Sequence, residues 1–176
     1  AGKSTLVQLL AGGLAPDQGS IHLAPSARIA VVGQKPDFGQ ACTVADWLLQ
    51  GIRQLGARLE ELETALAADS SPATLAAYGK AQEAFMEAGG WDAEDIAARL
   101  LARTGLPVAM DQELSVLSGG EKSVLSIVQA LVASPDLLIL DEPGNHLDYL
   151  GLAWLETFLA ELDCAVILIS HNRYLL

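Results

Sequence analysis

Two continuous apolar runs near the carboxyl end of the chain limit its possible folds more than any other feature of the sequence. Residues 137–140 read LLIL and residues 165–169 read AVILI, without polar alternation. Such runs are typical of strands that are buried on both faces of a parallel sheet. Residues 149–162 between them are amphipathic and predict a helix, so this part of the chain is expected to form a β-α-β unit. The predicted fold class is α/β with a parallel sheet.

The first forty residues predict one helix and two further strands. Residues 4–11 read as a short helix that Gly12 and Gly13 end. Residues 20–24 (SIHLA) and 28–32 (RIAVV) are two short segments that predict strands.

A helical block follows, in which Leu and Ile recur at helical spacing from Thr43 to about Gly105. Thr43 with Asp46 three positions later resembles a capping box, and Ser71-Pro72 predicts the start of another helix. The expected organisation is a core formed by residues 1–42 and 106–176 and a helical subdomain formed by residues 43–105.

Composition places the chain among ordinary globular domains and argues against two classes of partner. The 176 residues include 22 acidic and 10 basic side chains, which give a net charge of −12. An acidic surface repels nucleic-acid backbones, so no broad nucleic-acid patch is expected. The apolar runs are too short to span a bilayer, and no secretory leader precedes them. Cys42 and Cys164 lack ligand spacing and are expected to be buried thiols in a reducing cytoplasm.

The first residues of the chain match half of a phosphate-binding pattern. Gly2, Lys3 and Ser4 fit the end of G-x-x-x-x-G-K-[ST], in which backbone N–H groups of a glycine-rich turn surround phosphates. The leading glycine of that pattern would precede residue 1. The tripeptide alone does not distinguish a nucleotide site from a chance match.

Asp141 and Glu142 directly follow the apolar run 137–140, at the sheet edge where α/β folds bind ligands. Asp141 is suited to hold Mg²⁺, and Glu142 is suited to polarise a water for attack on a γ-phosphate. Acidic residues also follow buried strands simply because the chain has reached solvent. By themselves, the two residues leave that explanation favoured.

Two further motifs have both a structural and a functional interpretation. Ser118 and Glu121 form a capping box, and the N–H groups of a helix that begins Ser-Gly-Gly suit a phosphate. Glu121 in that position can equally serve only to cap its own helix. His171 follows the run 165–169, where an imidazole can reach a phosphate oxygen, but a lone His is more often structural or exposed.

The motifs GKST, VVGQKP, LSGGE, LLILDEP, NHLD and ISHNRY occur in this order along the chain. Their order and spacing resemble the ATP-binding cassette (ABC) family over nearly the whole sequence. The resemblance implies a P-loop NTPase (RecA-like) core with an inserted α-helical subdomain, and the ligands ATP and Mg²⁺. It also implies that the chain starts within the Walker A loop, so that the family's amino-terminal antiparallel sheet is missing. A second cassette is the implied partner.

Within that family, EPGNHLDYLGLAWLETFL followed by ISHNRYLL is similar to the ABC-F branch, whose members carry two cassettes and no membrane domains. LEELETALAA and the residues after it are similar to the helical subdomain of the first cassette of those proteins. The resemblance therefore implies a cytoplasmic ATPase that contacts the ribosome through regions outside this chain.

The resemblance also assigns roles to individual residues. Lys3 would hold the β- and γ-phosphates, and Thr5 would touch the α-phosphate. The implied catalytic residues are Glu142, His171 and Gln34, and the implied Mg²⁺ ligands are Ser4, Gln34 and Asp141. The implied nucleotide contacts are Gly2, Lys3, Ser4, Thr5, the signature residues Ser118, Gly119, Gly120 and Glu121, and the D-loop residue Asp148. In this family the signature residues reach the nucleotide that the opposite cassette holds.

Several positions depart from the family pattern and keep two alternatives open. Val124 and Gln129 stand where the family usually has arginines, Gly144 replaces a threonine, and Asn172 replaces an acid. A degenerate, non-hydrolysing cassette is one alternative, and the nucleotide-binding domain of a membrane transporter is the other. Because part of the Walker A loop and the adenine-stacking residue would precede residue 1, this piece alone is expected to bind ATP poorly and to be inactive.

Overall fold

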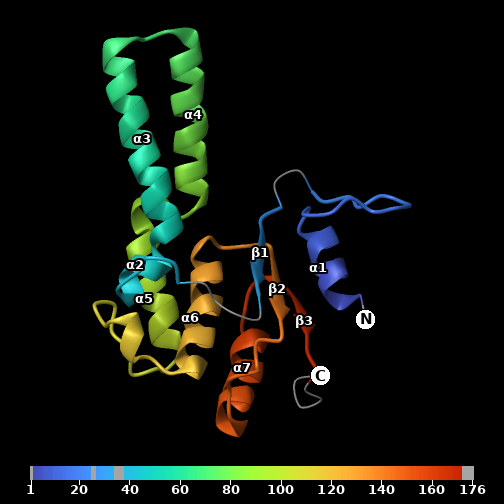
Figure 1. The fold of residues 1–176 in the computed structure, drawn as a ribbon. Coiled ribbons are helices and arrows are strands. Elements are labelled where there is room, and N and C mark those ends of the chain that lie inside the picture. Colours follow the sequence, from blue (N-terminus) through green and yellow to red (C-terminus); the bar gives the residue numbers. More distant parts are fainter. Residues whose placement is uncertain (1, 25–26, 34–37, 172–176) are drawn as a thin grey trace.

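The computed structural model describes residues 2–24, 27–33 and 38–171, so the predicted site residue Gln34 lies outside the described part. A parallel sheet lies at the centre, with helix α1 against one face and helices α6 and α7 against the other (Figure 1). Its strands are ordered β1-β2-β3. In chain order the elements are α1 (Lys3–Leu10), β1 (Ile29–Val32), α2 (Val44–Leu48), α3 (Gln50–Ala68), α4 (Pro72–Glu87), the 3-10 turn η1 (Gly90–Asp92), α5 (Ala93–Arg103), the 3-10 turn η2 (Leu114–Val116), α6 (Gly119–Val132), β2 (Leu137–Asp141), α7 (Tyr149–Ala160) and β3 (Ala165–Ile169).

Strand β2 lies at the centre of the hydrophobic core, because helices cover both of its faces. Leu138 and Leu140 pack under α6 and α7, while Ile139 points to the opposite face and packs with Val7 of α1. Strand β3 lies parallel beside β2, with Asp141 opposite Ile169. The predicted α/β class and the pairing of the two apolar runs are therefore confirmed.

Strand β3 is less buried than its sequence indicates. Its first residue, Ala165, is exposed, and only Ile169 is fully buried. Among the described strands, β3 pairs only with β2, so one of its edges has no strand partner. The expectation that residues 165–169 are buried on both faces was wrong for the start of this strand, since the cluster that contains Val7 of α1 includes Ile167 and Ile169 but not Ala165.

The predicted strand at residues 20–24 is not formed. Residues 11–24 are exposed, and residues 20–24 pair with no described strand. Ile21 and Leu23 remain 39% and 48% exposed, so neither a ladder partner nor a core stabilises an extended segment here. The second prediction in this region was right, because β1 lies within residues 28–32.

The helical block begins as the sequence predicts. The hydroxyl of Thr43 accepts a hydrogen bond from the Asp46 N–H, and the Asp46 carboxylate accepts one from the Thr43 N–H. Helices α3 and α4 form a hairpin that projects away from the sheet (Figure 1). Helices α2 and α5, however, share a buried cluster with α6. The division into a separate subdomain at residues 43–105 stays a prediction.

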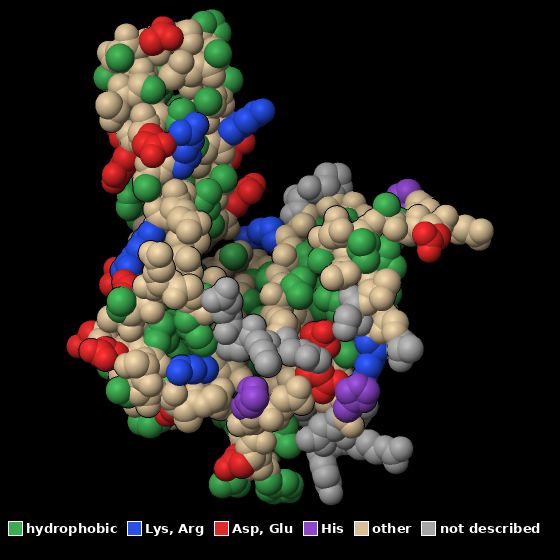
Figure 2. Space-filling model, in the orientation of Figure 1, with side chains coloured by type: hydrophobic (Ala, Val, Ile, Leu, Met, Phe, Trp, Pro, Cys, Tyr) green, Lys and Arg blue, Asp and Glu red, His purple; other side chains and the backbone are tan. Residues whose placement is uncertain are grey.

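Acidic and basic side chains are dispersed over the face shown in Figure 2, where Lys and Arg lie among Asp, Glu and apolar groups rather than in one broad patch. The described helices include none that combines the length and the apolar character needed to cross a membrane.

Candidate functional site

Glu142 lies at the carboxyl end of β2, and the ends of two strands fix its position. Its N–H donates to the carbonyl of Ile169 at 2.8 Å, which extends the β2–β3 ladder by one residue. Its φ is +56°, in the left-handed region that side chains other than glycine rarely occupy. Such a conformation costs about 1–3 kcal/mol and is typically held in place at functional sites. The backbone therefore presents this carboxylate from a strained, fixed position.

The Glu142 side chain is only 4% exposed, and its contacts come from the two ends of the chain. Oε2 accepts a hydrogen bond from the backbone N–H of His171 at 3.1 Å. Oε1 is buried and has no hydrogen-bond partner among the described residues. The Lys3 ammonium lies 3.8 Å from Oε1, and His171 Nε2 lies 3.6 Å from it. Oε1 of this buried carboxylate can therefore still accept a hydrogen bond, and no described residue donates one to it.

Lys3 and His171 also contact each other. The Lys3 ammonium lies 3.0 Å from His171 Nε2, which can accept a hydrogen bond only when that nitrogen carries no proton. Lys3 is the first residue of α1, directly after Gly2, whose φ of +89° suits glycine. Residues 168 positions apart in the sequence therefore form one cluster with Glu142.

The other predicted motif residues form a second group on α6 and α7. Ser118 and Glu121 cap α6 reciprocally, with Ser118 N–H donating to Glu121 Oε2 at 2.7 Å and Glu121 N–H donating to the Ser118 hydroxyl at 3.2 Å. The backbone N–H of Ser118 holds the pKa of the Glu121 carboxyl below its ordinary value. Asp148 caps α7 by accepting from the Gly151 N–H at 2.8 Å. Both carboxylates therefore have a structural role.

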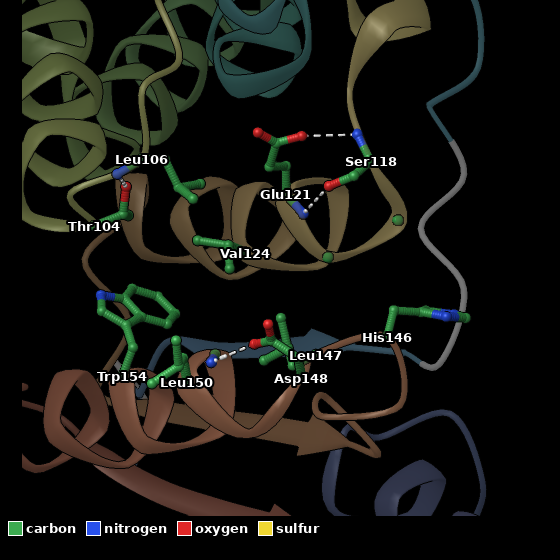
Figure 3. A pocket seen from close by; sticks show the side chains of 13 residues that line it. Thr104, Leu106, Ser118, Glu121, Val124, His146, Leu147, Asp148, Leu150 and Trp154 are labelled. Atoms are coloured by element: carbon green, nitrogen blue, oxygen red, sulfur yellow. Dashed lines mark hydrogen bonds between the residues drawn. The ribbon is translucent and has the colours of Figure 1, made fainter.

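This second group lines a cavity of about 670 Å³ between the starts of α6 and α7, shown in Figure 3. Gly120 sits where a Cβ atom would lie 3.1 Å from the carbonyl oxygen of His146. At Gly119 the nearest atoms would be 3.7 Å away, which is ordinary contact. The absence of a side chain at position 120 therefore allows the start of α6 to pack closely against the backbone of His146.

The structure brings some predicted site residues together and separates others. Lys3, Glu142 and His171 form the cluster at the sheet edge, and none of them lines the cavity. Thr5 is exposed on α1, and Ser4 belongs to the same first turn, although its side chain is not described. Asp141 is half-buried at the end of β2. Gln34 falls outside the described residues.

The residues at the sheet edge fit a magnesium ion bound with a phosphate. Mg²⁺ in proteins typically takes one or two carboxylates and completes its shell with water and phosphate oxygens. Asp141 supplies one carboxylate at this edge, and the described part of the chain contains no group of three or more His, Cys, Asp or Glu side chains suited to a metal. One carboxylate at this edge is compatible with a Mg²⁺ ion that takes its other ligands from water and phosphate oxygens.

The sequence profile described as ABC transporter matches residues 1–145. The chain belongs to the ABC transporter family. The match supports an ATP-binding cassette domain.

Relatives of known sequence cover the whole chain. The ABC transporter ATP-binding protein YkpA of Bacillus subtilis is 34% identical over 178 residues, which are 100% of this chain and 33% of that protein. The energy-dependent translational throttle protein EttA of Mycobacterium tuberculosis is 32% identical over 179 residues, which are 100% of this chain and 32% of that protein. The chain therefore spans about a third of the length of these relatives.

Solved ABC structures share the fold. The structure of cbiO1 from Clostridium perfringens, part of the ABC transporter complex cbiONQ, is 25% identical with a TM-score of 0.62. The match covers 97% of this chain and 63% of that one. The predicted P-loop NTPase fold class is confirmed.

Sequence reasoning missed much of the cavity wall. Thr104, Leu106, Leu150 and Trp154 line it beside the signature residues. In the sequence, Leu150 and Trp154 belong to an amphipathic stretch and look like ordinary core positions. Of the apolar side chains in the wall, Val124 is the one that the sequence singled out, because it stands where the family usually has an arginine.

Proposed function

We propose that this chain provides an ATP-binding cassette site that binds and hydrolyses MgATP together with a second cassette. The observation that supports this most directly is the buried Glu142 carboxylate beside Lys3 and His171, one oxygen of which accepts no hydrogen bond from the described residues. A low-exposure carboxylate next to a phosphate site is suited to orient a water and to accept its proton. Family membership agrees with this chemistry.

Each residue near Glu142 has a distinct part in the proposed reaction. Lys3 would leave its resting contacts and bind the β- and γ-phosphates, and this movement would free Oε1 for the attacking water. His171 would hydrogen-bond the γ-phosphate while its N–H keeps Glu142 Oε2 in place. Asp141, Ser4 and Gln34 would hold Mg²⁺, which neutralises charge on the phosphate oxygens when it is bound.

The need for a second cassette is supported by the positions of the two groups of residues. Ser118 and Gly119 are exposed at the start of α6, on the face of the sheet opposite α1. Lys3 lies at the start of α1. We infer that the signature residues of this chain serve a nucleotide held by a partner cassette.

For the cellular role we propose a cytoplasmic, ABC-F-like protein associated with translation. This rests on the ABC-F motifs in the sequence and on the similarity to EttA, a translational throttle protein by name. A role as the ATPase of a membrane transporter is the second candidate, because cbiO1 shares the fold. Cosedimentation of the full-length protein with ribosomes or with membrane vesicles separates the two. Binding to vesicles alone would favour the transporter.

Calorimetric titration of the full-length protein with MgATP tests the site itself. Lys3→Ala should weaken binding about tenfold or more, because a direct charge contact to the phosphates is lost. Lys80→Ala, on the exposed surface of α4, is the control and should leave binding unchanged. Equal affinities for the two variants would contradict the assignment of Lys3. Any second cassette should carry its own Walker lysine substitution in all samples.

A further inference from the structure

The segment formed by residues 146–148 lies between the starts of α6 and α7, and a glycine of each helix approaches it. Figure 3 shows Leu147 and Asp148 between the two helices. At Gly120 of α6, a Cβ atom would lie 3.1 Å from a backbone carbonyl oxygen of this segment. At Gly151 of α7, a Cβ atom would lie 3.1 Å from the Leu147 Cβ and 3.2 Å from Asp148 Oδ1. Both helices therefore contact the segment at positions that have no side chain.

The space around position 151, rather than its backbone conformation, explains the glycine there. Gly151 lies in the first turn of α7 and has ordinary helical backbone angles. Glycine is among the least favoured residues inside a helix. Gly79 of α4 provides a contrast, because a Cβ atom there would meet no atom of the described residues within 4 Å. Alanine at position 79 thus has room, whereas alanine at position 151 must displace a neighbour.

The two neighbours of Gly151 are themselves held in place. The Leu147 side chain packs against the buried cluster of β2, α6 and α7, and its N–H donates to the carbonyl of Gly144 at 3.1 Å. Asp148 Oδ1 accepts a hydrogen bond from the Gly151 N–H at 2.8 Å. Leu147 cannot move away without losing contacts in the core. A methyl group at position 151 would therefore displace the Asp148 carboxylate and break its bond to the helix.

A displaced Asp148 would alter the surface beside the start of α6. Asp148 and the exposed start of α6 line the same cavity. Under the proposed function, this part of the chain serves a nucleotide held by the partner cassette. Glu142 is fixed separately, by backbone groups of β3 and His171 at the sheet edge. A side chain at position 151 should therefore disturb the partner's nucleotide and leave the site at Lys3 in place.

From these contacts we propose that Gly151 is a positioning residue for the nucleotide that the partner cassette holds. It acts through its neighbours, because the lack of a side chain lets Leu147 and Asp148 settle between the starts of α6 and α7. The two helix starts then present one fixed surface to the partner. This role rests on the proposed function, and it adds a residue that contacts no phosphate itself.

The full-length protein with its partner cassette provides the test, in two backgrounds. Glu142→Gln restricts ATP turnover to the nucleotide of the partner cassette, and the equivalent substitution in the partner restricts turnover to the site at Lys3. Gly151→Ala should slow turnover at least about fivefold in the first background, because contacts to the nucleotide are misplaced, and should leave the second unchanged. Gly79→Ala is the matched control and should change neither. Equal losses in both backgrounds, or no loss in the first, would overturn the proposal.

Amide hydrogen exchange of the nucleotide-free protein supplies a measurement that needs no turnover. Gly151→Ala should lower the protection factor of the amide at position 151 about fivefold, the loss expected for a helix-capping hydrogen bond. An unchanged protection factor would overturn the proposal, because Asp148 would not have moved. Alanine favours helix, so the variant should fold. If neither background hydrolyses ATP without further substitution, the proposed ATPase fails, and hydrogen exchange alone decides whether Gly151 positions Asp148.

Discussion

Glu142 combines a left-handed backbone conformation with an almost fully buried carboxylate. Both features cost free energy, and the nearby Lys3 ammonium offsets part of the second. In the nucleotide-free protein, the lysine that would bind phosphate is thus paired with the carboxylate that would activate water. Under the proposed function, binding of ATP by Lys3 would separate this pair and leave the carboxylate ready for its role.

The strength of this resting pair is measurable by a double-mutant cycle. We predict that Lys3 and Glu142 couple by about 1 kcal/mol, between the values of exposed and buried pairs, because Lys3 is partly solvated. The variants are Lys3→Ala, Glu142→Gln and the double variant, each unfolded with urea in the absence of nucleotide. A coupling free energy within error of zero would mean that the contact contributes nothing to the resting state.

At the scale of elements, the start of α6 depends on a glycine that cannot gain a side chain without movement. A Cβ at position 120 would lie 3.1 Å from the His146 carbonyl oxygen, whereas one at position 119 would not be crowded. We predict that Gly120→Ala is less stable than Gly119→Ala by about 1 kcal/mol, since alanine otherwise favours helix at both positions. Urea unfolding of the two variants side by side checks this. Equal stabilities would contradict this prediction, since they would show that the backbone at His146 moves away from the added methyl group without a cost in stability.

The start of α2 should respond to acid. A hydrogen bond from the Arg53 side chain, followed by those from Thr43, lowers the pKa of Asp46 from 3.8 to about 2. A carboxyl whose pKa is lower in the folded state stabilises the protein above its unfolded pKa, and this contribution disappears as the pH falls from about 4 to about 2. The stability difference between wild type and Asp46→Asn should therefore shrink over this range in urea unfolding. Asp69→Asn, at the exposed end of α3, is the control. A constant difference for Asp46→Asn would contradict this account.

Local sequence patterns predicted the elements better than they predicted the contacts between them. The capping boxes at Thr43 and Ser118 were readable because both partners lie within three residues of each other. The contact of Lys3 with His171 was not readable, because it depends on packing between distant segments. The strand expected at residues 20–24 failed for the same reason, since a strand exists only where another strand or a core accepts it.

At the scale of the whole molecule, the two groups of motif residues lie on different elements and do not share one cavity. The cluster at the carboxyl end of β2 holds the groups suited to catalysis, and the starts of α6 and α7 hold the signature residues. A nucleotide bound at Lys3 would not reach the cavity that Ser118 lines. This separation supports the proposal that the signature residues serve a nucleotide held by a second cassette. The net charge of −12 restricts favourable docking to partners that present basic groups, or to small contact areas.

The central claim is that Glu142 is the group that activates water for ATP hydrolysis, and turnover by Glu142→Gln tests it most directly. The amide keeps the shape of the side chain but cannot accept the proton. We predict unchanged MgATP affinity and hydrolysis slowed by roughly 10²–10⁴-fold in the full-length protein, with any second site disabled in every sample. Glu156→Gln, on the exposed face of α7, is the matched control and should hydrolyse ATP at the wild-type rate. Hydrolysis by Glu142→Gln at the rate of that control would contradict the account.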